Sequence, residues 1–191
     1  MKKFLMIAAL ALGVSAAAMA QPRAIGGRLG ATGVEVSYEH TLGGSNFVEV
    51  NAGLDYLGGI GAKAAATYNF MVAQPNWTDR GEWGVYVGPG LTTGWVGDIV
   101  KYKYSEGGYT YSSSTVGNGF MLALAAQVGL EYTFWFPLQL SVDIRPYIGM
   151  HIWNGEVYNN GGVKVNADSK VGFYETGLYG FIPTVSVRYR F

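Results

Sequence analysis

Residues 120–135 read FMLALAAQVGLEYTFW, and this segment decides the fold. Leu122, Leu124 and Leu130 occupy even positions, whereas Gln127 and Glu131 occupy odd positions. Successive side chains of a strand point to opposite faces, so the alternation predicts a β-strand with one apolar and one polar face. Strands of soluble proteins average about 5 or 6 residues, whereas a tilted membrane strand needs about 9–11. The length of this segment therefore favours a strand that crosses a membrane.

The same alternation recurs on both sides of this segment. It is clearest in residues 34–40, 48–56, 60–70, 83–95, 138–148 and 181–191. A soluble sandwich alternates in the same way, so segment length and aromatic placement have to distinguish the two architectures. Tyr56, Tyr68, Trp83, Trp95 and Tyr189 lie near strand ends, as in the interfacial girdles of membrane barrels. The pattern predicts an all-β fold, a transmembrane up-and-down antiparallel β-barrel of about eight strands.

The connections between the predicted strands differ in length on the two sides of the barrel. If 23–31 is the first strand, segments 42–46, 73–82 and 136–137 fall on one side and are short. Segments 97–118 and 151–179 fall on the other side, where we expect two long extracellular loops. Short periplasmic turns and long external loops are typical of outer-membrane barrels.

The N-terminal residues predict export. Lys2 and Lys3 precede an apolar stretch over 4–14, and small residues follow as far as Ala20. This is the three-part plan of a secretory signal peptide, and the apolar stretch is too short for a spanning helix. We expect a signal peptide over 1–20 and one barrel domain over 21–191, located in the outer membrane.

Charge and composition argue against several kinds of partner. The chain has 13 basic and 13 acidic residues, two histidines and no cysteine. Loss of Lys2 and Lys3 leaves the mature chain slightly acidic, so no nucleic-acid partner is expected. We expect no metal and no cofactor, because cysteine is absent and His40 and His151 are far apart in sequence.

Several stretches resemble a known family. The terminal Phe191, with Tyr189 and Val187 at alternate positions before it, is similar to the C-terminal signal of outer-membrane barrels. The stretches IGGRLGA, VEVSYEHTLGG, VGLEYTF, PLQLSVDIRP and VSVRYRF together resemble small barrels related to the transmembrane domain of OmpA and to OmpX. The resemblance implies an eight-stranded barrel that is recognised by the barrel assembly machinery and surrounded by outer-membrane lipid and lipopolysaccharide.

Charged residues on the polar faces are expected to fill the lumen. They are Arg28, Glu35, Glu39, Glu49, Lys63, Glu131, Asp143, Arg145, Arg188 and Arg190, with Asp55 on the same face of its strand. Eight strands enclose a space that side chains fill, and buried charges there have to pair. We expect a closed, salt-bridged lumen, with a structural network of Glu131, Asp143, Arg145 and Arg188 on the last three strands. A narrow path for ions or small solutes through the same charges is the alternative.

The expected loops are the candidate binding surface. Tyr102, Tyr104, Tyr109 and Tyr111 flank a glycine-containing tip and suggest a projecting hairpin. Tyr, Ser and Gly together make adaptable contact surfaces, which favours adhesion to an external partner. A tyrosine-rich interface girdle explains the same residues equally well. Asn159-Asn160-Gly161-Gly162 suggests a second hairpin.

No enzymatic function is expected. Lipid A-modifying barrels use a histidine with a serine and an acidic residue near the outer leaflet. His40 falls at the opposite end of its strand, and no serine stands two positions after His151. Both histidines are interpreted as girdle or loop residues. The sequence therefore predicts a non-catalytic outer-membrane barrel with a structural or surface-binding role.

Overall fold

The computed structural model describes residues 23–43, 45–106, 108–153, 155, 157–158, 164–165 and 171–191. The expected signal peptide over 1–20 lies outside the described residues. The strands are β1 (Arg23–Leu29), β2 (Gly33–Thr41), β3 (Asn46–Asp55), β4 (Gly61–Ala73), β5 (Glu82–Glu106), β6 (Tyr109–Thr133), β7 (Leu138–Ile144), β8 (Tyr147–Trp153), β9 (Val157–Tyr158), β10 (Lys164–Val165), β11 (Val171–Phe173) and β12 (Thr184–Arg190). A short 3-10 helix, η1 (Thr176–Phe181), precedes β12. Within the described ranges, no helix is both long and apolar enough to cross a membrane.

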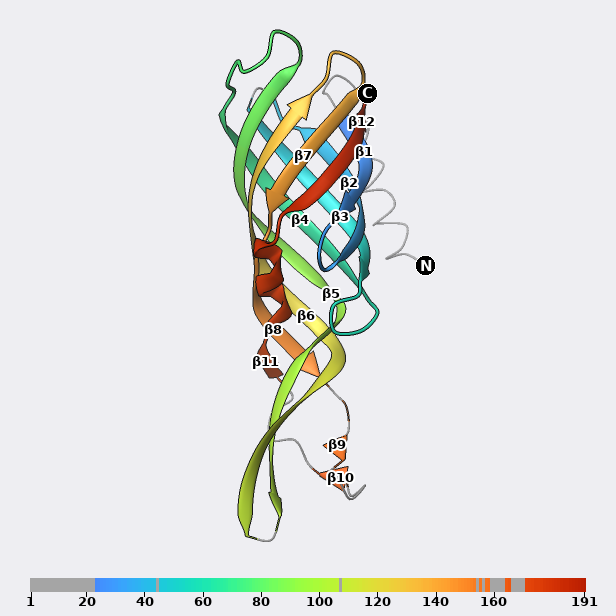
Figure 1. Ribbon diagram of the computed structural model, residues 1–191, viewed down its shortest axis with the longest axis vertical. Coiled ribbons are helices and arrows are strands. Elements are labelled where there is room, and N and C mark those ends of the chain that lie inside the picture. Colours follow the sequence, from blue (N-terminus) through green and yellow to red (C-terminus); the bar gives the residue numbers. More distant parts are fainter. Residues whose placement is uncertain are drawn as a thin grey trace, which may run out of the picture.

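The strands close into an eight-stranded antiparallel barrel, as the alternation predicts (Figure 1). Each strand from β1 to β6 pairs with the next, and β12 pairs with both β7 and β1. β7 and β8 both pair with β6 and form one interrupted strand. Pro146 lies at the interruption and has no backbone N–H to donate to a ladder. Where β1 meets β12, Arg23 and Phe191 exchange backbone hydrogen bonds of 3.1 and 2.8 Å, which complete the ring.

The polar face of each strand turns inward and the apolar face outward. Leu124 and Val187 are 65% and 49% exposed, whereas Gln127 and Arg188 are 0% and 1% exposed. This is the reverse of a soluble sandwich, in which the apolar side chains form the core. The alternation of 120–135 therefore places apolar side chains on the outer surface of a closed barrel.

Aromatic rings contact one another at the end of the barrel that carries the C-terminus. Trp83, Tyr132 and Phe134 form a chain of ring contacts with centroid separations of 4.7 and 4.6 Å. Tyr68 contacts Phe70 and Tyr189 contacts Phe191 on neighbouring parts of this rim. The short connections 42–45, 74–81 and 134–137 all lie at this end, as expected.

The two long segments expected as loops at the opposite end contain strands where the structure describes them, and the hairpin predicted from Tyr102, Tyr104, Tyr109 and Tyr111 is confirmed. Residues 97–118 continue β5 and β6 as a paired hairpin as far as Glu106 and Tyr109. The alternation of Val96, Asp98 and Val100 continues past Trp95, so the ladder extends beyond the rest of the barrel. Residues 151–179 contain the end of β8, then β9, β10, β11 and part of η1. The expected second hairpin is present as the β9–β10 pair, and its tip at 159–162 lies outside the described residues.

Close packing inside the barrel depends on glycine at one position in particular. A Cβ added at Gly129 would lie 2.3 Å from Cζ of Tyr86 and 2.7 Å from Cβ of Asp143. Gly129 therefore makes room for the fully buried Tyr86 ring. An outward-facing glycine, Gly27, has open space around its Cβ position instead.

We predict that Gly129→Val destabilises the barrel by about 1–3 kcal/mol, because the new side chain overpacks the interior. Gly27→Val is the matched control and is expected to change stability by less than about 0.5 kcal/mol. Urea unfolding of both variants in lipid vesicles, followed by tryptophan fluorescence, measures the difference. Equal stabilities would contradict the close packing of Tyr86 against Gly129.

Candidate functional site

The lumen holds a buried network of charged side chains. Nine of the ten charged residues expected there are buried: Arg28, Glu35, Glu39, Glu49, Lys63, Glu131, Asp143, Arg145 and Arg188. Arg190 lies nearer the rim and is partly exposed, because β12 ends there. Asp55, on the polar face of β3, is also buried. Alternation thus identifies the inward set correctly, apart from the residue at the strand end.

Arg28 on β1 is the centre of this network. Its guanidinium binds the Asp143 carboxylate through two contacts of 2.6 and 2.8 Å, the fork geometry that suits arginine and carboxylate. Glu35 and Glu49 lie 3.5 and 3.6 Å from the same guanidinium. One cation thus stabilises carboxylates from β2, β3 and β7.

Arg188 on β12 forms the second centre. It contacts Glu49 at 2.7 Å and donates hydrogen bonds to the hydroxyls of Ser37 and Ser141 at 2.8 and 2.9 Å. Gln127 donates to the other oxygen of Glu49 at 2.9 Å. Burying the Glu49 carboxylate is tolerable because each of its oxygens has a donor.

The pairing differs from the expected network of Glu131, Asp143, Arg145 and Arg188. Asp143 pairs with Arg28 on β1, and Arg145 pairs with Glu35 on β2 at 2.5 Å. Glu131 accepts a hydrogen bond from Gln139 at 2.9 Å. The cause is the narrow lumen, which lets long side chains reach over intervening strands to partners that sequence spacing does not bring together.

A third group of carboxylates lies toward the rim that carries the C-terminus. Gln139 donates to Glu131 and, at 3.3 and 3.4 Å, to Glu39. Arg188 lies 3.7 Å from Glu39. Glu39, Glu131, Gln139 and Arg190 line a cavity of about 80 Å³.

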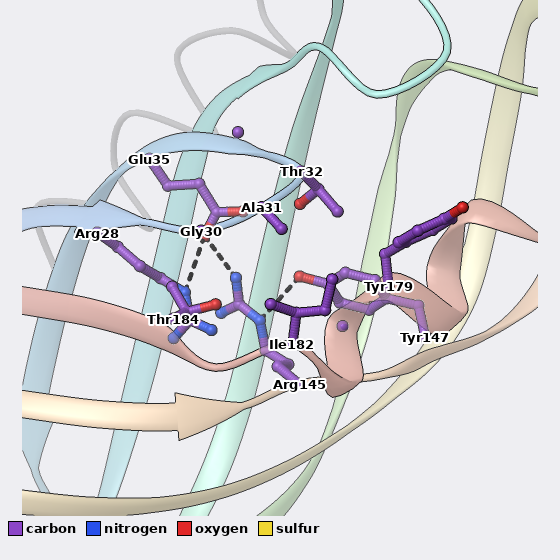
Figure 2. Close-up of a pocket in the computed structure, with 12 residues that line it drawn as sticks. Arg28, Gly30, Ala31, Thr32, Glu35, Arg145, Tyr147, Tyr179, Ile182 and Thr184 are labelled. Atoms are coloured by element: carbon purple, nitrogen blue, oxygen red, sulfur yellow. Dashed lines mark hydrogen bonds and ion pairs between the residues drawn. The ribbon is translucent and has the colours of Figure 1, made fainter.

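The opposite end of the network is held by Arg145 and Lys63. Figure 2 shows Arg28 and Arg145 directed at the same carboxylate, Glu35, with Tyr147 accepting from Arg145. Lys63 contacts Asp55 at 2.6 Å and the hydroxyl of Thr32 at 2.7 Å. The cavity that Arg28, Glu35 and Arg145 line measures about 20 Å³, room for about one water molecule.

An apolar layer covers the charges on this side. Val96, Met121, Ala123, Ala125, Tyr147 and Tyr174 form one buried cluster. Met121 and Val96 are 0% exposed, and Tyr174 is 1% exposed. An ion moving along the axis would have to cross this layer without solvation, which is costly.

Beyond the apolar layer, the wall closes through side chains instead of a backbone ladder. We call this contact between residues 97–101 and 172–176 the seam. Asp98 accepts the backbone N–H groups of Glu175 and Thr176 at 3.0 and 2.9 Å. Lys101 forms an ion pair with Glu175 on the outer side. The sequence interpretation missed Asp98, although the alternation of Val96, Asp98 and Val100 places it on the inner face.

His151 lies inside the seam and is 3% exposed, so its interpretation as a girdle or loop histidine is wrong. It is on β8, at an inward position next to the seam. Its Nε2 lies 3.0 Å from the carbonyl oxygen of Val96, and its ring stacks on Tyr174. Among the residues that the structure describes, no group of three or more His, Cys, Asp or Glu side chains is placed to hold a metal ion.

The tyrosines of the β5–β6 hairpin form a ladder along one face. Tyr102, Tyr104 and Tyr111 follow one another with ring centroids 6.2 and 5.3 Å apart. Tyr102 packs against Val100 and Trp153 at the base of the hairpin. Tyr109 and Tyr111 are 72% and 45% exposed near the tip. The row of rings therefore runs from Tyr102, which packs on the buried base of the hairpin, to the exposed ring of Tyr111 near the tip.

We predict that Arg28→Ala lowers the free energy of unfolding by about 3–5 kcal/mol, because three buried carboxylates lose their shared cation. Lys101→Ala is the control, since it removes an exposed ion pair worth less than about 1 kcal/mol. Urea titration in lipid vesicles gives both values. Similar losses in the two variants would contradict a stabilising role for the lumen network.

Comparison with protein-family models, with curated proteins and with solved structures found no match to this chain.

Proposed function

We propose that this protein is a non-catalytic outer-membrane barrel with a closed lumen, which presents the β5–β6 hairpin to an external partner. The observation that carries the proposal is the inverted arrangement of the barrel, with paired charges inside and apolar side chains outside. Water cannot solvate such an outer surface favourably, whereas lipid can.

The outer surface supports the placement in a membrane. Leu124, Leu91 and Val187 are 65%, 59% and 49% exposed on the outer face of the barrel. Trp95 and Tyr56 are exposed at one end of this band, and the aromatic rim of Tyr132 and Phe134 lies at the other. Two aromatic rims that border an apolar band are typical of barrels in an outer membrane, where the rings contact the lipid headgroups. Outer-membrane lipid and lipopolysaccharide are the surroundings that we propose.

The C-terminus supports the proposed recognition by barrel assembly machinery. Val187, Tyr189 and Phe191 are 49%, 57% and 58% exposed on the outer face. Their side chains remain accessible along the closing strand, next to β1. This arrangement is compatible with the OmpA- and OmpX-like assembly signal that the sequence resembles.

The lumen supports a structural role rather than transport. The ion pairs of Arg28 and Arg188 fill the centre, and the layer around Met121 and Tyr174 covers them. A conducting path would need water along the axis, and the charges would then be solvated instead of paired. Binding outside the lumen is therefore favoured over conduction.

The hairpin supports a binding role because the exposed ring of Tyr111 is held in place by the half-buried ring of Tyr104. Tyr104 and Tyr111 stack at an interplanar angle of 21° across the two strands. Tyrosine supplies a large contact area at a low cost in conformational entropy. The ladder is continuous with the buried contact of Tyr102 and Trp153, so the hairpin is anchored to the barrel.

We expect the purified protein to show no steady current in planar lipid bilayers, since the apolar layer around Met121 blocks the axis. A porin measured in the same bilayers verifies that the assay detects open barrels. Reproducible single-channel openings of the intact protein would contradict a closed lumen.

We also expect cells that display the protein to lose adhesion to their target surface when residues 101–114 are replaced by Asn-Gly. This replacement keeps Val100 opposite Thr115, so the register at the base is preserved. The triple variant Tyr104→Ser, Tyr109→Ser, Tyr111→Ser keeps the hairpin length and is expected to show the same loss. Undiminished adhesion in both variants, with normal surface levels, would contradict a role of the hairpin in binding.

A further inference from the structure

The seam encloses a cavity that the proposed function does not use. It measures about 200 Å³ and lies between the edge of β5 and the edge of β11. β5 has already left β4 here, since their ladder ends at Ala62 and Trp95. β11 pairs with β8 on its other side (Figure 1). The cavity is therefore a gap between two strand edges, spanned by side chains alone.

Apolar side chains form the inner wall of the cavity and the two sides of its outer opening. Val100 and Trp153 form the inner wall, and both belong to one buried cluster. Ile99 and Phe173 also line the cavity, although they are 40% and 49% exposed on the outside. Gly172 on β11 also lines the cavity, and a Cβ added to it would meet no atom within 4 Å.

The polar groups that line the cavity already have partners. Both oxygens of Asp98 accept backbone N–H groups, and His151 contacts the carbonyl oxygen of Val96. Lys101 and Glu175 pair with each other. A polar ligand would have to break these contacts, whereas an apolar ligand leaves them intact and gains the burial of its own surface.

We propose that the seam cavity binds a small apolar molecule of about the size of one aromatic ring. An apolar cavity of about 150 Å³ is known to be large enough for benzene, so the seam cavity accommodates a ring with a short substituent. Such a ligand contacts Trp153 and Val100 inside and passes between Ile99 and Phe173. The methyl end of a lipid acyl chain has the same chemistry and is the second source of such a ligand.

Access is controlled by the ion pair at the outer edge of the cavity. Lys101 and Glu175 are 72% and 32% exposed at their side chains, so water weakens this pair. The pair can therefore open without unfolding the β5–β6 ladder. Asp98 and Thr176 keep the two edges together below it.

The test uses toluene as the probe, titrated into the intact protein in phospholipid nanodiscs. Binding is measured from the saturable NMR shift of the Trp153 indole N–H and the backbone amides of β8 and β11. We expect saturable shifts in the unmodified protein. Gly172→Leu is expected to weaken binding at least tenfold by filling the cavity, because a Cβ at this position meets no atom within 4 Å. Gly172→Ala is expected to have an intermediate effect.

Gly27→Leu is the matched control, since it also adds a side chain where a Cβ meets no atom within 4 Å, but on the outer face of β1. It is expected to leave toluene binding unchanged. Lack of saturable shifts in the unmodified protein, or equal affinities in Gly172→Leu and Gly27→Leu with both barrels folded, would overturn the proposal.

A second arm identifies the natural source of the ligand. Nanodiscs are prepared with a phospholipid that carries a spin label near the end of its acyl chain. Broadening of the Trp153 indole signal that Gly172→Leu abolishes supports an acyl chain in the cavity. Saturable toluene binding without such broadening supports a free small molecule. Adhesion by the β5–β6 hairpin is measured independently, so failure of either proposal is distinguishable from failure of the other.

Discussion

Closure of the β-sheet into a narrow ring is the constraint on which the rest of the structure depends. Eight strands leave an interior that side chains fill, so each charged residue that points inward has to find its partner there. Arg28 and Arg188 satisfy this requirement by each contacting carboxylates from more than one strand. The outer face is then free to be apolar, and the proposed membrane location depends on this division.

The strands of this ring differ in length at the end opposite the C-terminus. The β5–β6 hairpin and the seam cavity, the two candidate binding features, both lie at that end. β5 and β6 continue for 25 residues each, whereas β1 and β2 are 7 and 9 residues long. Where the shorter strands have stopped, Asp98 and Glu175 replace the missing ladder with side-chain contacts. The projecting hairpin and the seam cavity are therefore two results of one difference in strand length.

Much of this structure could be predicted from alternation alone, because a period of two fixes which side chains share a face. That reasoning places Glu49, Lys63 and Arg145 in the lumen and Leu124 outside. It could not predict that Asp143 binds Arg28, because such pairings depend on how far strands shift along one another when the ring closes. The projecting hairpin within 97–118 could be predicted from its glycine-containing tip, whereas the length of its ladder could not, since serine, tyrosine and glycine are as common in loops as in extended hairpins. His151 was misplaced because the alternation continues past residue 148 as far as Trp153.

The ion pairs of the lumen have a consequence for how the barrel is made. Arg28 and Asp143 are 115 residues apart in sequence, and Arg145 and Glu35 are 110 apart. Contacts between residues so far apart in sequence are costly in chain entropy and form late in folding. The charges have to stay hydrated until the first and last strands meet. The interior of the folding chain therefore has to hold water, which leaves only at the final step. Assembly of this barrel is therefore expected to be slow and cooperative, with the drying of its centre as the concluding event.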